Sequence, residues 1–397
     1  MQPTEQAASV RDADGHRPPP WRDVRVIRVA LQVGFVAAAL GTIWWLYSNL
    51  ANNLARLGIR RDFAFLDQSA GFTIFGSDFS ATSSIRVALW VGLQNTLRVA
   101  LLGIALALLI GIVVGVLRLS SNWLVKRTAS IYVEVLRNVP PLVLIIFFYL
   151  AVLQTLPGIS DAATPGDVMV VSNRGVWLPW VELGTGTGAF AATAAVAVLA
   201  AMLVAAWRRR VHDATGRPHH RVLWGGGTAL VLLGLGYLTL SPPISMSIPL
   251  LEGRSVTGGA LLFPEYAALL VSLVLYTSAF IAEIVRGSIQ AVPKGQVEAA
   301  QALGLSSWDR LRRVVLPQAL RIAAPATGNE FLNLSKNVSL GVVIAYPELL
   351  RVGRQAIGNG QPAPQILLIV LAAYLGVSLV LSLGVNIANR RLQLVEH

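Results

Sequence analysis

The sequence contains no cysteine and few charged residues. Without cysteine, the chain has no disulfide, no thiolate metal site and no thiol nucleophile. Only 13% of its 397 residues are charged, against about 25% in an average soluble protein. Hydrophobic residues make up 54% of the chain, and the mean hydropathy is +0.62. These values predict an all-α, multi-pass membrane protein.

Motifs for catalysis and phosphate binding are also missing. There is no GxxxxGK[ST] loop and no GxGxxG after a predicted strand. The five histidines lie in polar loops or tails without the spacing of metal ligands, and no Ser-His-Asp or paired-carboxylate arrangement is visible. We therefore expect no catalytic residue, no metal site and no cofactor, and ATP hydrolysis would require a partner subunit.

Eight apolar spans are predicted, each near the ~20 residues that cross a bilayer. They cover residues 28–48, 89–117, 139–156, 189–207, 222–240, 267–287, 322–347 and 364–387. The second span is long, so we expect residues 85–96 to lie at the membrane interface and Arg98 to snorkel at the outer boundary. The polar segment up to about residue 25 is predicted to be disordered.

The net charge of +12 could suggest nucleic-acid binding, but the positions of the basic residues favour a topology signal. With the N-terminus in the cytoplasm, inside segments carry 21 lysines and arginines and outside segments carry eight. This asymmetry predicts that both termini are cytoplasmic. We expect contact with membrane lipid and no binding of nucleic acid.

The longest patterned polar segment is Pro293–Pro317, PKGQVEAAQALGLSSWDRLRRVVLP. Its first proline suits the start of a helix, and Gly304 is well placed as a left-handed cap at that helix's end. Ser306 and Asp309 have capping-box spacing for a second helix, which we expect the last proline to end. Asp309 and Arg313 should pair across one turn. The pattern predicts a cytoplasmic helix–turn–helix, and a solvated connector is the alternative.

This segment also contains a Glu-Ala-Ala triplet, then a glycine and, after nine more residues, a Val-x-Leu-Pro ending. These residues are Glu298, Ala299, Ala300, Gly304, Val314, Leu316 and Pro317. Their order and spacing resemble the EAA loop of ABC-transporter permeases, with valine in place of isoleucine. The resemblance implies that the triplet, the glycine and the Leu-Pro pair couple the chain to a cytoplasmic ATPase.

Other segments extend the resemblance to polar-amino-acid permeases. They are residues 92–97 (GLQNTL), 118–120 (RLS), 134–140 (EVLRNVP) and 333–340 (NLSKNVSL), where Val338 replaces the usual threonine. The arrangement resembles the larger, eight-span subunits of general L-amino-acid transporters. It implies the five-helix core of a type I ABC importer plus three additional helices.

The mapping onto that family predicts the domain organisation. It comprises a cytoplasmic tail (1–27), an extra first span with an outer loop (28–88), a first permease core segment (89–156), an insert with two extra spans (157–266) and a second permease core segment (267–397), which holds the coupling loop 288–321. The core spans are then the second, third, sixth, seventh and eighth.

The same resemblance implies the partners and the location. They are a second permease in a heterodimer, a cytoplasmic ABC ATPase dimer, a periplasmic amino-acid-binding protein and an L-amino acid substrate, in the bacterial inner membrane. Transport would proceed by alternating access. Two alternatives stay open: a secondary transporter without an ATPase, although we find no internal repeat, and an ABC permease for another solute, such as opines or sulfur-containing amino acids.

Polar residues recur on one face of the seventh span: Asn329, Asn333, Lys336 and Asn337. At ~1.5 Å per residue they lie roughly 10–22 Å from its inner end. A lysine there costs at least ~2.5 kcal/mol unless it faces water or a partner. We predict that this face lines the substrate pathway, with helix packing or snorkelling as the alternatives.

In the sixth span, Tyr276 and Glu283 share a face and are further candidates for the pathway. An ion pair between Glu283 and Arg286, three residues on, is the simpler interpretation. In the second span, Gly111 and Gly115 form a GxxxG pair, which predicts close helix packing.

Overall fold

The structure is a computed structural model that describes residues 24–56, 58, 62–184, 186–216, 220–239 and 244–392. Residues 1–23, which make up most of the predicted N-terminal tail, lie outside the described residues. The chain divides into two units, one up to Phe65 and one from Leu66 onwards. The first unit contains α1 (Val24–Arg56), whose large hydrophobic side chains are exposed along its length. The short helix η1 (Ala64–Asp67) follows.

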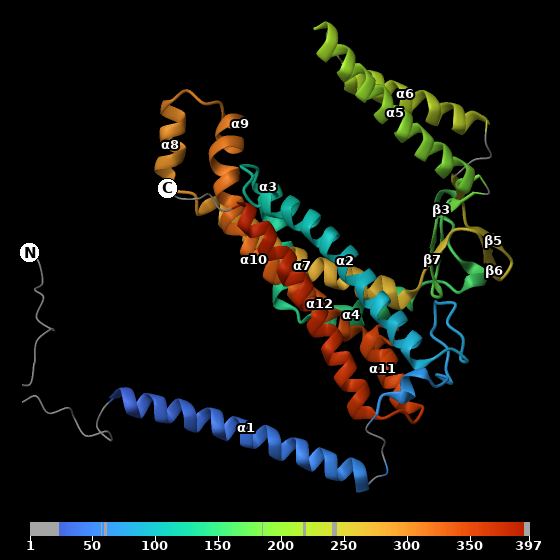
Figure 1. The fold of residues 1–397 in the computed structure, drawn as a ribbon, viewed down its shortest axis with the longest axis vertical. Helices are drawn as coiled ribbons and strands as arrows, with labels where there is room; N and C mark the ends of the chain where they lie inside the picture. The colour runs from blue at the N-terminus through green and yellow to red at the C-terminus, as the bar shows by residue number, and fades with distance from the viewer. Residues whose placement is uncertain are drawn as a thin grey trace, which may run out of the picture. The chain divides into compact units, whose positions relative to one another are not determined.

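The second unit is built on α2 (Ile85–Leu117) and α7 (Pro264–Gln290), which pack along each other (Figure 1). A Cβ atom at Gly111 would lie 2.6 Å from Ile281 Cβ, and one at Gly115 would lie 2.8 Å from the Ala282 carbonyl oxygen. Only glycine leaves room for so close an approach. This confirms the predicted packing role of the GxxxG pair.

The other core helices pack around this pair. They are α3 (Trp123–Asn138), α4 (Pro141–Ile146), the π-helix η2 (Phe147–Leu153), α10 (Leu316–Asn337), the 3-10 helix η6 (Val338–Ile344), α11 (Leu349–Gly358) and α12 (Ala363–Leu392). Between α3 and α4–η2 the chain bends by 102°. Tyr132 of α3 ties this bend to α7, because its hydroxyl lies 2.7 Å from Ser278 Oγ.

Six helices of the described residues are long and apolar enough to cross a membrane, and the bent α3–α4–η2 segment is a further candidate. Most of the predicted spans are therefore confirmed. The predicted span 322–347 is divided between α10 and η6, and α10 does not reach the same hydropathy. Residues 85–96, predicted to lie at the interface, form the first turns of an unbroken α2.

The inserted region contains short antiparallel strands that the sequence did not predict. β1 (Val170–Ser172), β2 (Gly175–Leu178) and β7 (Ala260–Leu262) form one sheet, in that order; β3 (Trp180–Leu183) pairs with β4 (Ile244–Ser247), and β5 (Leu250–Glu252) pairs with β6 (Ser255–Thr257). The helices α5 (Thr187–Thr215) and α6 (Arg221–Thr239) pack on each other between β3 and β4. Because β2 pairs with β7, the insert leaves and rejoins the core at one place.

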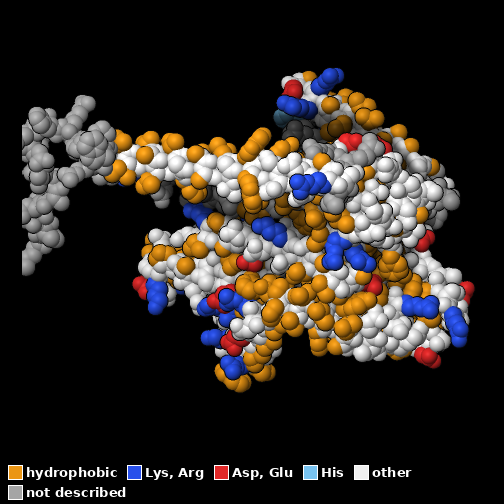
Figure 2. All heavy atoms as spheres, turned by 90° about the horizontal axis from the view of Figure 1, so that it is seen from below, with side chains coloured by type: hydrophobic (Ala, Val, Ile, Leu, Met, Phe, Trp, Pro, Cys, Tyr) orange, Lys and Arg blue, Asp and Glu red, His pale blue; other side chains and the backbone are white. Residues whose placement is uncertain are grey.

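The surface of the chain is largely apolar. Figure 2 shows hydrophobic side chains spread over one face, with lysine, arginine and acidic side chains in small groups between them. Exposed leucines run along α12, including Leu371, Leu375, Leu379 and Leu383. Exposed apolar surface on this scale is typical of a chain solvated by lipid.

We expect Gly115→Val to destabilise the protein, because the added side chain would push α2 away from the Ala282 carbonyl and from Val285. Overpacking of this kind costs roughly 1–3 kcal/mol. Gly376→Val on α12 is the matched control, since nothing lies within 4 Å of a Cβ atom there. The measurement is the unfolding temperature of the purified protein in detergent. Equal unfolding temperatures for the two variants would refute close α2–α7 packing.

Candidate coupling and substrate-pathway site

The loop after α7 folds into the predicted helical hairpin. Its first helix is α8 (Lys294–Ala302). Gly304, two residues after the end of α8, has a left-handed φ of +74°. The Leu305 N–H donates to the Ala300 carbonyl at 3.2 Å, and the Gly304 N–H donates to the Gln301 carbonyl at 2.9 Å. These two bonds form a Schellman cap. The predicted glycine cap is therefore confirmed.

The second helix begins at α9 (Ser307–Arg310), where Ser306 Oγ accepts a bond from the Asp309 N–H at 3.1 Å. Arg313 pairs with Asp309 at 3.2 Å, as predicted. The prediction that Pro317 ends this helix was wrong. The helix continues through the π-helix η5 (Leu311–Val315) into α10, and Pro317 lies in the first turn of α10. The hairpin is thus continuous with a core helix.

The surface of the hairpin is open along α8. Glu298 and Ala299 are exposed, whereas Ala300 is buried. Two apolar side chains at the turn are also exposed, Leu303 at 81% and Trp308 at 67%. α8 and α9 lie side by side at the same end of α7 and α10 (Figure 1). Exposed apolar side chains beside an exposed carboxylate make this end suitable for docking a partner.

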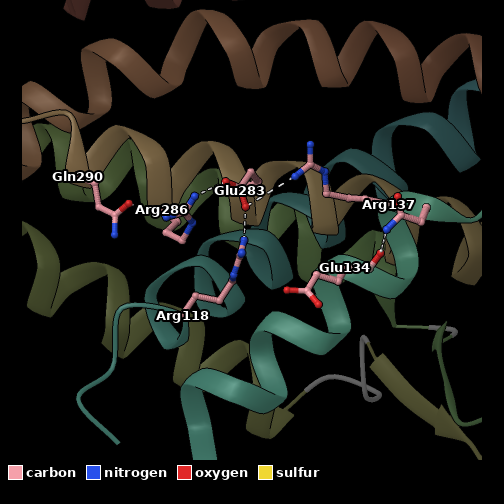
Figure 3. A network of polar contacts seen from close by, with 7 residues as sticks. Arg118, Glu134, Arg137, Glu283, Arg286 and Gln290 are labelled. Atoms are coloured by element: carbon pink, nitrogen blue, oxygen red, sulfur yellow. Dashed lines mark hydrogen bonds and ion pairs between the residues drawn. The ribbon is translucent and has the colours of Figure 1, made fainter. Parts of the chain in front are cut away.

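A cluster of charged side chains joins α2, α3 and α7 near the hairpin (Figure 3). Glu283 of α7 pairs with Arg286, as predicted, and with Arg118 at the end of α2. Arg137 of α3 lies 3.7 Å from the same carboxylate and 5.1 Å from the centre of the Phe280 ring. One carboxylate therefore holds three guanidinium groups from three helices. The Arg286 pair follows from the spacing in the sequence, whereas Arg118 and Arg137 are distant in the chain and were not predicted to join it.

The polar face of α10 meets this cluster through Glu330. Glu330 accepts a hydrogen bond from Asn333 and interacts electrostatically with Arg137. Tyr276 of α7 interacts with Glu330 in turn. The structure therefore brings together Tyr276, Glu283 and Asn333, three of the six pathway candidates, through Glu330 and Arg137. Sequence reasoning missed Glu330, although it follows the candidate Asn329 directly.

The other three pathway candidates lie on the open side of α10. Asn329 and Lys336 are exposed in this chain, and Asn337 is half-buried. α10 packs closely on α12 at Gly328, where an added Cβ atom would clash with Val385. The Asn329 and Lys336 side chains of the polar face remain exposed beside this contact. Its role in the pathway remains a prediction.

The segment GLQNTL of α2 fixes the start of α11. A Cβ atom at Gly92 would lie 3.0 Å from Leu349 Cα. The Asn95 side-chain amide donates to the Pro347 carbonyl at 2.9 Å, and Thr96 Oγ1 accepts from the Leu349 N–H at 3.1 Å. The motif therefore connects two elements more than 200 residues apart in the sequence.

Glu348, which the sequence analysis did not single out, caps α11 from within this contact. Its buried carboxylate accepts from the N–H groups of Leu350 at 2.7 Å and Arg351 at 2.6 Å, and from the Tyr374 hydroxyl at 2.6 Å. Burial raises the pKa of Glu348 to about 7, and the three hydrogen bonds and the Arg351 charge oppose this rise. A buried carboxyl group thus links α11 to α12.

Comparison with known proteins gives a family. The model of the family described as "Binding-protein-dependent transport system inner membrane component" matches residues 229–394. The chain is 40% identical over 383 residues to the general L-amino acid transport system permease protein AapQ of Rhizobium johnstonii, covering 95% of this chain and 94% of that protein. It is 40% identical over 372 residues to the putative amino-acid ABC transporter permease protein YhdX of Escherichia coli, covering 92% and 94%.

A third relative is the glutamate/glutamine/aspartate/asparagine transport system permease protein BztB of Rhodobacter capsulatus. It is 33% identical over 409 residues, covering 94% of this chain and 95% of that protein. Among solved structures, an amino acid ABC transporter crystallised with histidines has 21% identity and a TM-score of 0.46, covering 77% of this chain and 94% of that chain.

The apolar helices and the exposed hairpin define a multi-pass membrane transport component. The chain belongs to the family of binding-protein-dependent transport system inner membrane components. That family consists of transport components rather than catalytic subunits. The membership favours the ABC-permease hypothesis over a secondary transporter that needs no partner.

We expect Glu283→Gln to lower the unfolding temperature of the protein, because three guanidinium groups would lose their common carboxylate. Breaking a buried ion pair costs roughly 3–5 kcal/mol, and the 27% exposure of Glu283 reduces this to about 1–3 kcal/mol through solvent screening. Glu134→Gln is the control, since Glu134 is an exposed carboxylate on neighbouring α3. An unchanged unfolding temperature for Glu283→Gln would show that the cluster does not hold the three helices.

Glu348 should make stability depend on pH. Its folded-state pKa of about 7 exceeds the ordinary value of 4.5. The contribution of Glu348 to the free energy of unfolding is therefore fully present below pH 4.5, and it is lost as the pH rises through 7. The wild type should lose up to about 3 kcal/mol relative to Glu348→Gln over this range. Unfolding temperatures from pH 5 to 8 measure the difference, with Glu134→Gln as control. Parallel pH profiles for the wild type and Glu348→Gln would contradict this assignment.

Proposed function

We propose that this chain is the membrane-spanning subunit of an ATP-driven importer for polar L-amino acids. The observation that carries the proposal is the exposed helical hairpin Pro293–Pro317, which is capped at Gly304 and whose second helix continues through η5 into α10. Full-length relatives are named as permeases of amino-acid transport systems, which supports this substrate class. The chain has no nucleotide-binding motif of the GxxxxGK[ST] type, so the hairpin serves a separate ATPase.

The hairpin transmits movement because the turn between its two helices is capped on both sides. The Schellman cap at Gly304 fixes the end of α8, and the Ser306 cap fixes the start of α9. Closure of an ATPase dimer against α8, near Glu298, then moves the hairpin as one body. One side of the hairpin is continuous with α10, and the other joins α7 after Gln290. The movement therefore reaches the two helices that carry the pathway candidates.

The open face of α10 supports our proposal that a second permease packs there. Exposed polar side chains such as Asn329 and Lys336 are costly against lipid, and a partner permease in a heterodimer would cover them. The substrate pathway then runs along this face, past Tyr276 and Glu283. We place the chain in the bacterial inner membrane with both termini cytoplasmic, and a periplasmic binding protein delivers the amino acid.

Gly304→Val and Glu298→Arg should abolish uptake without affecting membrane insertion. Valine at a φ of +74° is strained by about 1–2 kcal/mol or more, which would misalign the hairpin, and Glu298→Arg reverses an exposed charge on α8. We expect at least a tenfold loss of ATP-dependent L-glutamine uptake in vesicles that contain the complete transporter. The matched control is Gly295→Val, because Gly295 is on α8 and has free space around it.

Normal uptake by both test variants would refute the coupling role of α8. A separate experiment tests the class of transporter, by inactivating the ATPase. Persistent uptake would support a secondary transporter, and its loss supports the proposed importer. Competition of L-glutamine uptake by octopine or L-cystine then tests the alternative substrates.

A further inference from the structure

A cavity of about 310 Å³ lies between the inserted strands and the core helices. Its walls come from α2, α7, the segment before α11, and the strands β3 and β7. Trp180 of β3 and Leu261 of β7 contribute from the insert, and Tyr266 and Tyr346 contribute from the core. The volume is within the ~300–1,000 Å³ typical of ligand pockets. The insert therefore closes a space of ligand size over the ends of α2 and α7.

Two opposite charges line this cavity without pairing. Arg98 of α2 and Glu265 of α7 both contribute to its walls. Among the described residues, neither takes part in an ion pair. Arg98 makes one long hydrogen bond, 3.4 Å from its Nη1 to Asn95 Oδ1. Most of its donors are thus available to an anion.

Glu265 is also incompletely satisfied. Its Oε1 accepts a hydrogen bond from the Tyr149 hydroxyl at 3.1 Å. Its Oε2 is buried and has no hydrogen-bond partner among the described residues. A buried carboxylate oxygen without a donor costs free energy, and a cationic donor would offset this cost. The position is therefore suited to an ammonium group.

We propose that this cavity binds a free amino acid as a zwitterion, with its α-carboxylate at Arg98 and its α-ammonium at Glu265. A guanidinium group and a carboxylate at separate positions in one cavity match the two charges of an amino acid. The tyrosine rings of Tyr266 and Tyr346, whose centres are 5.9 Å apart, offer a surface for the ammonium group or an aliphatic stem. The site rests on the proposed amino-acid transport and lies at the opposite end of α7 from the coupling hairpin.

The test uses the complete transporter in nanodiscs without its binding protein, and L-glutamine as the probe. We expect Arg98→Gln and Glu265→Gln each to weaken binding at least tenfold, and Arg98→Lys and Glu265→Asp to restore some of the lost affinity. Arg254→Gln is the control, because Arg254 lines the neighbouring cavity, which also borders Glu265. On the wild type, N-acetyl-L-glutamine should compete at least tenfold less well than L-glutamine, since it lacks the ammonium charge.

Equal affinities for the wild type and both glutamine variants would overturn the site, as would equal competition by N-acetyl-L-glutamine or no binding at millimolar L-glutamine. A loss caused by Arg254→Gln alone would place the ligand in the neighbouring cavity and also overturn the proposal. ATP-dependent uptake by the wild type with its binding protein is measured in parallel. Uptake without cavity binding would refute this site and leave the proposed function intact, whereas no uptake of any amino acid would refute that function.

Discussion

The close approach of α2 and α7 is the constraint on which the rest of the core depends. Lipid is as apolar as a leucine side chain, so helices in a membrane associate through packing and polar contacts. Here Gly111 and Gly115 bring α2 within van der Waals contact of Ile281 and Ala282 on α7. With this distance fixed, polar side chains at both ends of the pair can meet.

The two ends of this pair carry different chemistry. At one end, Glu283 ties Arg118 of α2 to α7, close to the coupling hairpin. At the other end, Arg98 of α2 and Glu265 of α7 line a cavity without pairing. A carboxylate shared by three guanidinium groups resists separation of the helices that carry them, whereas two unpaired charges leave their donors and acceptors open to a ligand. In the proposed mechanism, a movement of the hairpin would therefore pass through the Glu283 cluster toward the end of the helix pair where we propose that an amino acid binds.

Local features of the chain were predictable from sequence because their physics is local. The Gly304 cap, the Ser306 cap and the Asp309–Arg313 pair depend on spacing within one or two turns. The failure at Pro317 has a similar scale. The π-helix η5, in which the Leu316 N–H donates to the Leu311 carbonyl, comes directly before Pro317, and the helix continues past a residue that has no N–H to donate. Arg137 and Glu330, by contrast, meet only through the tertiary fold. No spacing rule connects residues that distant.

The segment 157–266, which we predicted to be an insert, is held together at its two ends by strand pairing. Its outward strand β2 pairs with its returning strand β7, with Val176 opposite Leu262. Their hydrogen bonds satisfy backbone groups that an irregular loop would leave open, and they hold the two ends of the insert together. The core helices before and after it therefore keep their contact, as the α2–α7 packing requires. β7 comes directly before α7 in the chain. The strand that closes this segment therefore also forms a wall of the cavity beside Glu265.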